Sequence, residues 1–253
     1  MTQYGFLFDQ SRCIGCSNCV IACKQWHDIP PGPTKWMRVY QWEKGAFPNV
    51  RLHHLAIPCY HCENPSCVKA CPNEAIYKEN KYGAVLIDAN KCKGTRKCWA
   101  ACPYGAPQFD GDAPALKASK CDMCIGRLED GLAPICVLSC PMRSLEFGPI
   151  YELRKRYGSL RRLEDMPRDS ITDPNIVFIP SEPKKKQVIS WDADKALGLW
   201  QKRQPDQADE PLPDVFESIS GVTEMPSNIV GRNRLVLKPR DAEELIFYTS
   251  DDE

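Results

Sequence analysis

The sequence predicts an α+β fold of short helices and small antiparallel β-hairpins, followed by a long irregular C-terminal extension. Three observations support this prediction. The fifteen cysteines among the 253 residues form four groups, and each group contains one C-x₃-C pair that encloses small or apolar residues. Short apolar runs bounded by glycine, proline or asparagine lie beside these groups. From about residue 182 onward the chain has no cysteine, many prolines and alternating charge.

The apolar runs predict the strands in order along the chain. They are residues 4–8 before the first cysteine group, 36–40 between the first and second groups, 75–77 after the second, 84–87 before the third and 144–147 after the fourth. Each C-x₃-C pair predicts a helix of little more than one turn. Residues 149–157 predict a further helix with a proline in its first turn.

The C-terminal part, residues 151–253, is expected to be this helix followed by an extended arm that wraps a partner or the cysteine-rich core. A partly disordered tail is the alternative for the arm. Two apolar runs near the end, residues 234–237 and 245–248, are expected to dock onto another part of the structure.

The cysteine spacing is typical of iron–sulfur ligation. Two-cluster ferredoxins carry the run C-x₂-C-x₂-C-x₃-C-P, whose last cysteine ligates the other cluster. The first group matches this run, except that Lys24 stands where proline is usual. The second group has a longer middle step and ends before Pro72, and the last two C-x₃-C pairs precede Pro103 and Pro141. These motifs predict a chain that carries electrons.

Zinc sites and disulfides are the other uses of so many cysteines. A zinc site typically takes two C-x₂-C pairs, whereas the first group places four thiols in one short segment. The odd cysteine count, with a first segment too short and polar for a secretory signal, argues against a disulfide framework. The sequence predicts no transmembrane helix and no catalytic motif, and its net charge of zero argues against nucleic acid as a partner.

With these motifs the sequence resembles the four-cluster iron–sulfur subunits, the beta or electron-transfer subunits, of the dimethyl sulfoxide reductase superfamily of molybdopterin oxidoreductases. The resemblance covers about residues 1–180 and rests on CIGCSNC at 13–19, CYHCENPSC at 59–67, and KCDMC at 120–124 with Cys136 after a long gap. It implies two interlocked ferredoxin-like units that hold two clusters each. Residues 1–50 and 115–150 would form the outer unit, and residues 51–114 the inserted unit.

The resemblance also implies four ligand sets, named here set 1 to set 4. Set 1 would be Cys13, Cys16, Cys19 and Cys140, and set 2 would be Cys23, Cys121, Cys124 and Cys136. Set 3 would be Cys59, Cys62, Cys67 and Cys102, and set 4 would be Cys71, Cys92 and Cys98. The first three sets would each hold a [4Fe–4S] cluster.

Set 4 has one thiol fewer because Thr95 stands where the third group of the family usually has a cysteine. A neutral hydroxyl is a poor ligand for iron beside thiolates, so the predicted cofactor is a [3Fe–4S] cluster, as in related nitrate reductase subunits. A fourth [4Fe–4S] cluster with Thr95 or water on one iron is the alternative. The loss of one negative ligand also predicts a raised reduction potential.

The implied function is to relay electrons between a large molybdopterin catalytic subunit, which holds molybdenum or tungsten, and a membrane quinone-reactive anchor subunit. Set 1 would lie nearest the catalytic subunit, and the chain would not be an enzyme on its own. Its expected location is the outer face of the cytoplasmic membrane, reached by co-export with its partners, and the alternative is the cytoplasm. A soluble polyferredoxin-type carrier, the beta subunit of a soluble cytoplasmic molybdopterin enzyme and an iron–sulfur sensor are alternative functions. His61 is expected to form hydrogen bonds or pack, and Trp99 to pack in the core.

Overall fold

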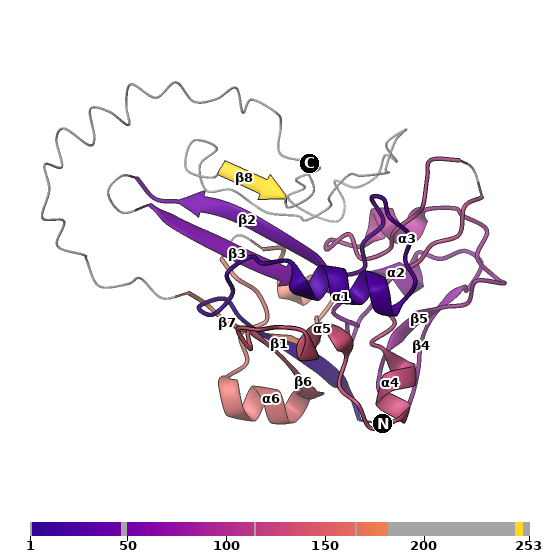
Figure 1. Ribbon diagram of the computed structural model, residues 1–253. Helices are drawn as coiled ribbons and strands as arrows, with labels where there is room; N and C mark the ends of the chain where they lie inside the picture. The colour runs from indigo at the N-terminus through magenta and orange to yellow at the C-terminus, as the bar shows by residue number, and fades with distance from the viewer. Residues whose placement is uncertain (1, 47–49, 114, 165, 182–245, 250–253) are drawn as a thin grey trace, which may run out of the picture.

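The computed structural model describes residues 2–46, 50–113, 115–164, 166–181 and 246–249, where short helices join three small β-sheets (Figure 1). In the first sheet, β1 (Tyr4–Asp9) pairs antiparallel with β6 (Leu145–Pro149) and parallel with β7 (Ile176–Ile179). The predicted strands at 4–8 and 144–147 are confirmed. The prediction missed β7, because a run of four apolar residues fits a buried helix as well as a buried strand.

The second sheet is built on a long hairpin of β2 (Arg38–Lys44) and β3 (Arg51–Ile57), which pair antiparallel along their full lengths. The predicted strand at 36–40 was misplaced: the strand begins at Arg38 and continues through polar residues, because each of them pairs with β3. The prediction missed β3 itself. Residue 50, where the first segment of the outer unit was expected to end, directly precedes β3.

At the other edge of this sheet, β8 (Ile246–Thr249) pairs antiparallel with β2, so the apolar run at 245–248 docks as predicted. The remainder of the expected arm, including the run at 234–237, lies outside the described residues.

The third sheet is the predicted hairpin of β4 (Ile76–Lys78) and β5 (Val85–Ile87). The four C-x₃-C pairs lie at short helices, as predicted. The helices are α1 (Asn18–Trp26), α2 (Ser66–Lys69), α3 (Lys97–Ala101) and α5 (Ile135–Leu138), and α1 packs on α5 while α2 packs on α3. The prediction missed α4 (Ile125–Glu129), which begins directly after Cys124.

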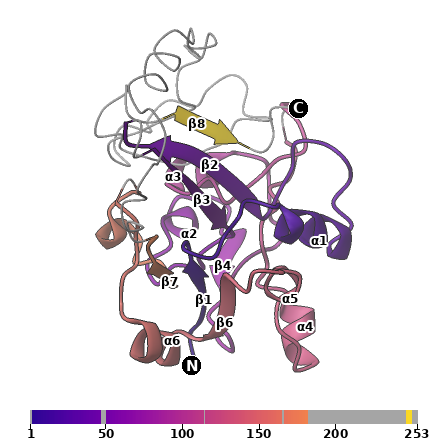
Figure 2. The ribbon, with the colours of Figure 1, turned by 60° about the vertical axis from the view of Figure 1, so that its left-hand side comes forward.

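The predicted helix at 149–157 is α6 (Ile150–Tyr157), with Pro149 at its N-terminal cap, and it covers the first sheet (Figure 2). Its side chains Ile150 and Leu153 pack against Leu7 and Val177. A 3₁₀ helix, η1 (Asp169–Ile171), lies between α6 and β7. The described residues 150–164 and 166–181 therefore belong to the folded body.

The core surrounds the cysteines rather than lying apart from them. Aromatic and aliphatic side chains of all three strands of the first sheet and of the β2–β3 hairpin share one cluster with Cys19, Cys59 and Cys136. A second cluster joins Cys67 and Cys98 to Trp99, which is buried as predicted. No helix among the described residues has both the length and the apolar character needed to cross a membrane.

Candidate iron–sulfur cluster sites

The four cysteine loops share one backbone shape. In each C-x-x-C or C-x-x-T segment, the residue before the last position has a positive φ. These residues are Gly15 at 69°, His61 at 44°, Gly94 at 68° and Met123 at 65°. Glycine adopts this conformation freely, whereas in other residues it costs about 1–2 kcal/mol of conformational free energy. The loops therefore repeat the same turn even where the sequence between the cysteines differs.

Set 1 lies around a pocket between the first cysteine loop and the Cys140 segment. Cys13, Cys16, Cys19 and Cys140 all line it. Burial and the charges of the other three thiols raise the pKa of Cys19 to about 12. Burial alone would also raise the pKa of Cys140, but hydrogen bonds from Ser144 leave it below its ordinary value. The Ser144 hydroxyl lies 3.1 Å from Cys140 Sγ.

Set 2 gathers thiols from α1, α5 and the loop before α4. Burial, with charges on Cys124 and Asp122, raises the pKa of Cys23 to about 12. Burial, with charges on Cys124 and Cys23, also raises the pKa of Cys136. His27 Nε2 lies 3.3 Å from Cys124 Sγ and 3.6 Å from the Asp122 carboxylate.

The contact of His27 was not predicted, since His27, His53 and His54 show no metal-ligand spacing with one another. It joins residues 97 positions apart in the sequence. Only their proximity in the fold reveals it.

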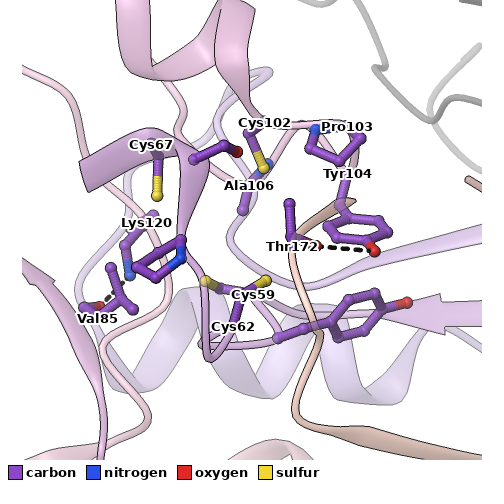
Figure 3. Close-up of a pocket in the computed structure, with 13 residues that line it drawn as sticks. Cys59, Cys62, Cys67, Val85, Cys102, Pro103, Tyr104, Ala106, Lys120 and Thr172 are labelled. Atoms are coloured by element: carbon purple, nitrogen blue, oxygen red, sulfur yellow. Dashed lines mark hydrogen bonds between the residues drawn. The ribbon is translucent and has the colours of Figure 1, made fainter. Parts of the chain in front are cut away.

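All four cysteines of set 3 are buried. Cys59, Cys62, Cys67 and Cys102 line one pocket together with Lys120 and Thr172 (Figure 3). Burial, followed by charges on Cys102, Cys59 and Cys62, raises the pKa of Cys67. The thiols therefore converge on one apolar space that is closed by few polar groups.

Set 4 contains Cys71, Cys92 and Cys98, and burial with the charges of the first two raises the pKa of Cys98 to about 12. Thr95 occupies the position that Cys16 occupies in set 1. The residues around it have the same backbone: Gly94 and Gly15 have φ of 68° and 69°, and Arg96 and Ser17 have φ of 60° and 57°. Both Thr95 and Cys16 are exposed.

The four sets form a row in the order 1, 2, 3, 4. The charge of Cys19 in set 1 acts on Cys136 in set 2, and α1 carries one cysteine of each of these sets. The charge of Cys59 in set 3 acts on Cys121 in set 2. The charge of Cys102 in set 3 acts on Cys98 in set 4, so each neighbouring pair of sets is close enough to interact.

Three C-x₃-C pairs end in the same Cys-Pro turn, at Cys71, Cys102 and Cys140. The residue before a proline avoids the α conformation, so the helix stops there and the chain turns. In each turn the amide three residues later donates to the cysteine carbonyl, and the next amide donates to its thiol. The N–Sγ distances are 3.3 Å from Ala75 to Cys71, 3.5 Å from Ala106 to Cys102 and 3.4 Å from Ser144 to Cys140.

This environment fits iron–sulfur clusters. Buried thiols with raised pKa values lose their protons when a cation offsets the cost of burying their charge, and iron supplies it. The amides aimed at the sulfurs stabilise the thiolates and are one of the levers on cluster potential. His61 Nδ1 accepts a hydrogen bond from the Val85 amide at 2.8 Å, which confirms its predicted hydrogen-bonding role.

The fold and the thiol sets define an iron–sulfur protein. Two family models, each described as a 4Fe-4S dicluster domain, match residues 12–76 and 50–150. A chain of the anaerobic dimethyl sulfoxide reductase of Escherichia coli K12 is 44% identical over 188 residues, which cover 71% of this chain and 90% of the relative.

Two other relatives come from a dehydrogenase and from another reductase. A subunit of the sulfite dehydrogenase of Allochromatium vinosum is 37% identical over 172 residues, covering 60% of this chain and 71% of the relative. The beta subunit of the perchlorate reductase of Dechloromonas aromatica is 29% identical over 252 residues, covering 70% and 75% respectively. The protein belongs to the family of electron-transfer iron–sulfur subunits of dimethyl sulfoxide reductase-type enzymes.

Proposed function

We propose that the chain relays electrons along four iron–sulfur clusters held by sets 1 to 4, without catalysing a reaction of its own. The clusters supply one-electron carriers, and the protein spaces them, buries them and hydrogen-bonds their sulfurs. The observation that carries the proposal is the row of thiol sets, in which each set interacts with the next. A single line of neighbouring sites is what a relay between two partners needs.

The ligands in this proposal are those of the four sets, with [4Fe–4S] clusters in sets 1, 2 and 3. The two interlocked units follow from the same assignment: the outer unit of residues 1–50 and 115–150 would hold sets 1 and 2, and residues 51–114 would hold sets 3 and 4. The packing of α1 on α5 and of α2 on α3 supports this pairing, because each helix pair bridges the two sets of one unit.

The cluster in set 4 would be a [3Fe–4S] cluster. The matching backbone angles around Thr95 and Cys16 support this, because a hydroxyl stands in the fourth ligand position. Replacement Thr95→Cys is expected to convert it to a [4Fe–4S] cluster, raising the iron content from about 15 to about 16 atoms per chain. The control Thr95→Ser keeps the hydroxyl and should keep the three-iron EPR signal of the oxidised protein.

The partners would be a large molybdopterin catalytic subunit and a membrane quinone-reactive subunit, with the complex on the outer face of the cytoplasmic membrane. The names of the relatives, each given as one chain or one subunit of a reductase or dehydrogenase, support a multi-subunit complex. Exposed apolar side chains in the loops and helices of set 1 support a protein contact at that end. They are Ile14, Ile21, Leu138 and Met142.

Anaerobic isolation of the native complex tests the proposal. Iron, molybdenum and tungsten are quantified, the co-purifying chains are identified, and the clusters are reduced stepwise while EPR spectra are recorded. We expect a large pterin-containing chain in fixed stoichiometry and four clusters. Iron without a pterin partner would support the free carrier, and fewer than four clusters would contradict the assignment of the sets.

A further inference from the structure

Lys120 is a buried cation beside the thiols of set 3. Only 4% of its surface is exposed, although lysine is among the residues least often buried. Its ammonium group donates hydrogen bonds to the carbonyls of Val85 and Cys121, the latter at 2.8 Å. Figure 3 shows it beside Cys67, at the wall of the pocket that the four thiols of set 3 line.

No carboxylate among the described residues forms an ion pair with Lys120. The buried acidic side chain in the described part of the protein is Asp9, which is bound to Arg12 and Ser11 instead. Burial of a lysine without an anion is costly, and the two carbonyls offer only partial compensation. The groups around Lys120 are instead thiol residues: Lys120 lines the pocket of Cys59 and Cys67 and donates to the carbonyl of Cys121.

These neighbouring cysteines belong to two sets. Cys59 and Cys67 are in set 3 and Cys121 is in set 2, so the ammonium group lies where these two sets meet. His61, which is buried and lies in the set 3 loop, cannot neutralise it, because an imidazole is either neutral or positively charged.

We infer that Lys120 is a positioning residue for electron transfer, whose buried positive charge raises the reduction potential of the set 3 cluster most and that of the set 2 cluster less. The inference rests on the proposed ligand sets. A cluster held by four thiolates is anionic and gains a further negative charge when it is reduced. A cation in a low-dielectric site favours the more negative state, since net charge and burial are both levers on the potential.

A second buried cation does not take over this role. Arg38 is 2% exposed and its guanidinium binds the carbonyls of Tyr104 and Gly105 at 2.8 and 2.9 Å. Its charge acts on Cys102 of set 3. A third buried cation, Arg127, donates to the Ala133 carbonyl at 2.9 Å, and its charge acts on Cys124 of set 2. Of these three buried cations, Lys120 is the one that lines the set 3 pocket and also binds the carbonyl of a set 2 cysteine, Cys121.

The test is a redox titration of the complex, monitored by EPR, for the variants Lys120→Met and Lys120→Gln. Glutamine keeps hydrogen-bond donors but has no charge, so it separates the effect of the charge from the effect of the hydrogen bonds to the Val85 and Cys121 carbonyls. The signal of the set 3 cluster is assigned beforehand with Cys62→Ser. The control Lys69→Met removes an exposed lysine two residues after Cys67.

With iron content unchanged, we expect both Lys120 variants to lower the reduction potential of the set 3 cluster and to lower that of the set 2 cluster by less. The potentials of the set 1 and set 4 clusters should not change. Lys69→Met should shift none of them, because solvent screens its charge. Unchanged set 3 potential in a fully loaded variant would overturn the inference while leaving the four-cluster assignment intact.

If both uncharged variants lose iron, Lys120→Arg decides the matter. Restored loading with the set 3 potential near that of the parent supports the inference, since only the charge is common to both side chains. Loss of iron in Lys120→Arg as well would show that lysine is needed for its shape, and the inference would be wrong. A parent protein with fewer than four clusters would instead contradict the proposed function.

Discussion

Gly94 is expected to be indispensable for the loop of set 4. Its φ is +68°, and a Cβ added there would lie 2.6 Å from the Cα and carbonyl carbon of Ala115 and from the Leu116 oxygen. The left-handed backbone costs alanine about 1–2 kcal/mol, and overpacking adds about 1–3 kcal/mol. Gly94→Ala should therefore destabilise the protein by about 2–5 kcal/mol.

The effect should extend to the cluster, because the atoms that would be displaced are backbone. The segment after Leu116 brings the Ala118 amide to Cys92 Sγ at 3.4 Å. A shift of this segment moves a hydrogen-bond donor away from a proposed ligand. The EPR signal of set 4 should be lost from Gly94→Ala before the signals of the other sets.

Gly131→Ala is the matched control. Gly131 has φ of +72°, and a Cβ added there would meet no other atom within 4 Å. Gly131→Ala should therefore destabilise the protein only by the cost of the left-handed backbone, about 1–2 kcal/mol. Both variants are compared by circular dichroism at one scan rate, since cofactor-containing chains rarely unfold reversibly in two states. An equal loss in melting temperature for both, with set 4 intact, would refute the steric argument.

Three further predictions concern single side chains. Arg38→Met leaves the carbonyls of Tyr104 and Gly105 without their charged donor and should lower thermal stability by about 2–4 kcal/mol, measured against the parent. Ser144→Ala removes the hydroxyl 3.1 Å from Cys140 Sγ. Because such a hydrogen bond contributes about 1 kcal/mol, its loss should lower the reduction potential of the set 1 cluster by about 40 mV in a redox titration. The hydrogen bond to Lys78 holds the pKa of Glu63 below 4.5, so the stability from this pair is present above that pH and is lost as the pH falls through the folded pKa. The free energy of unfolding of Lys78→Met should therefore differ from that of the parent by no more than about 1 kcal/mol near neutral pH, and the difference should vanish in acid.

The cysteine pattern predicts much of the local structure because the motif is itself a structural unit. A C-x₃-C pair that bridges two sites needs a helical turn, and helices were predicted at all four pairs. The strands at 4–8, 75–77, 84–87 and 144–147 are apolar runs with clear boundaries, and β1, β4, β5 and β6 lie there. Predictions failed where the secondary structure of a segment depends on the strand with which it pairs. Strand β3 has two consecutive histidines in its middle and owes its structure to pairing with β2.

The polar environment of the thiols could not be read from the sequence. Lys120 belongs to the motif KCDMC, but nothing in a sequence shows that a lysine is buried, because most lysines are exposed. The contact between His27 and Cys124 depends on how α1 and the loop before α4 pack. Such contacts arise from the assembled fold, and spacing rules cover only residues that are near in sequence.

The lysine after Cys23 shows how one residue changes the environment of a whole set. After the other three pairs a proline ends the helix, and a backbone amide turns to the thiol. After Cys23, Lys24 allows α1 to continue to Trp26, so the amide of His27 donates to the Cys23 carbonyl at 3.2 Å and is not available to sulfur.

The longer helix places the His27 ring on the opposite side of set 2, where Nε2 lies 3.3 Å from Cys124 Sγ. Cys23 instead takes its backbone hydrogen bond from Met37, outside the helix, and the His27 side chain is added beside another proposed ligand of set 2. A backbone amide keeps its charge distribution at every pH and in every variant, whereas an imidazole does not. The departure from the ferredoxin motif at Lys24 therefore places an imidazole beside set 2, the set that also shares Lys120 with set 3.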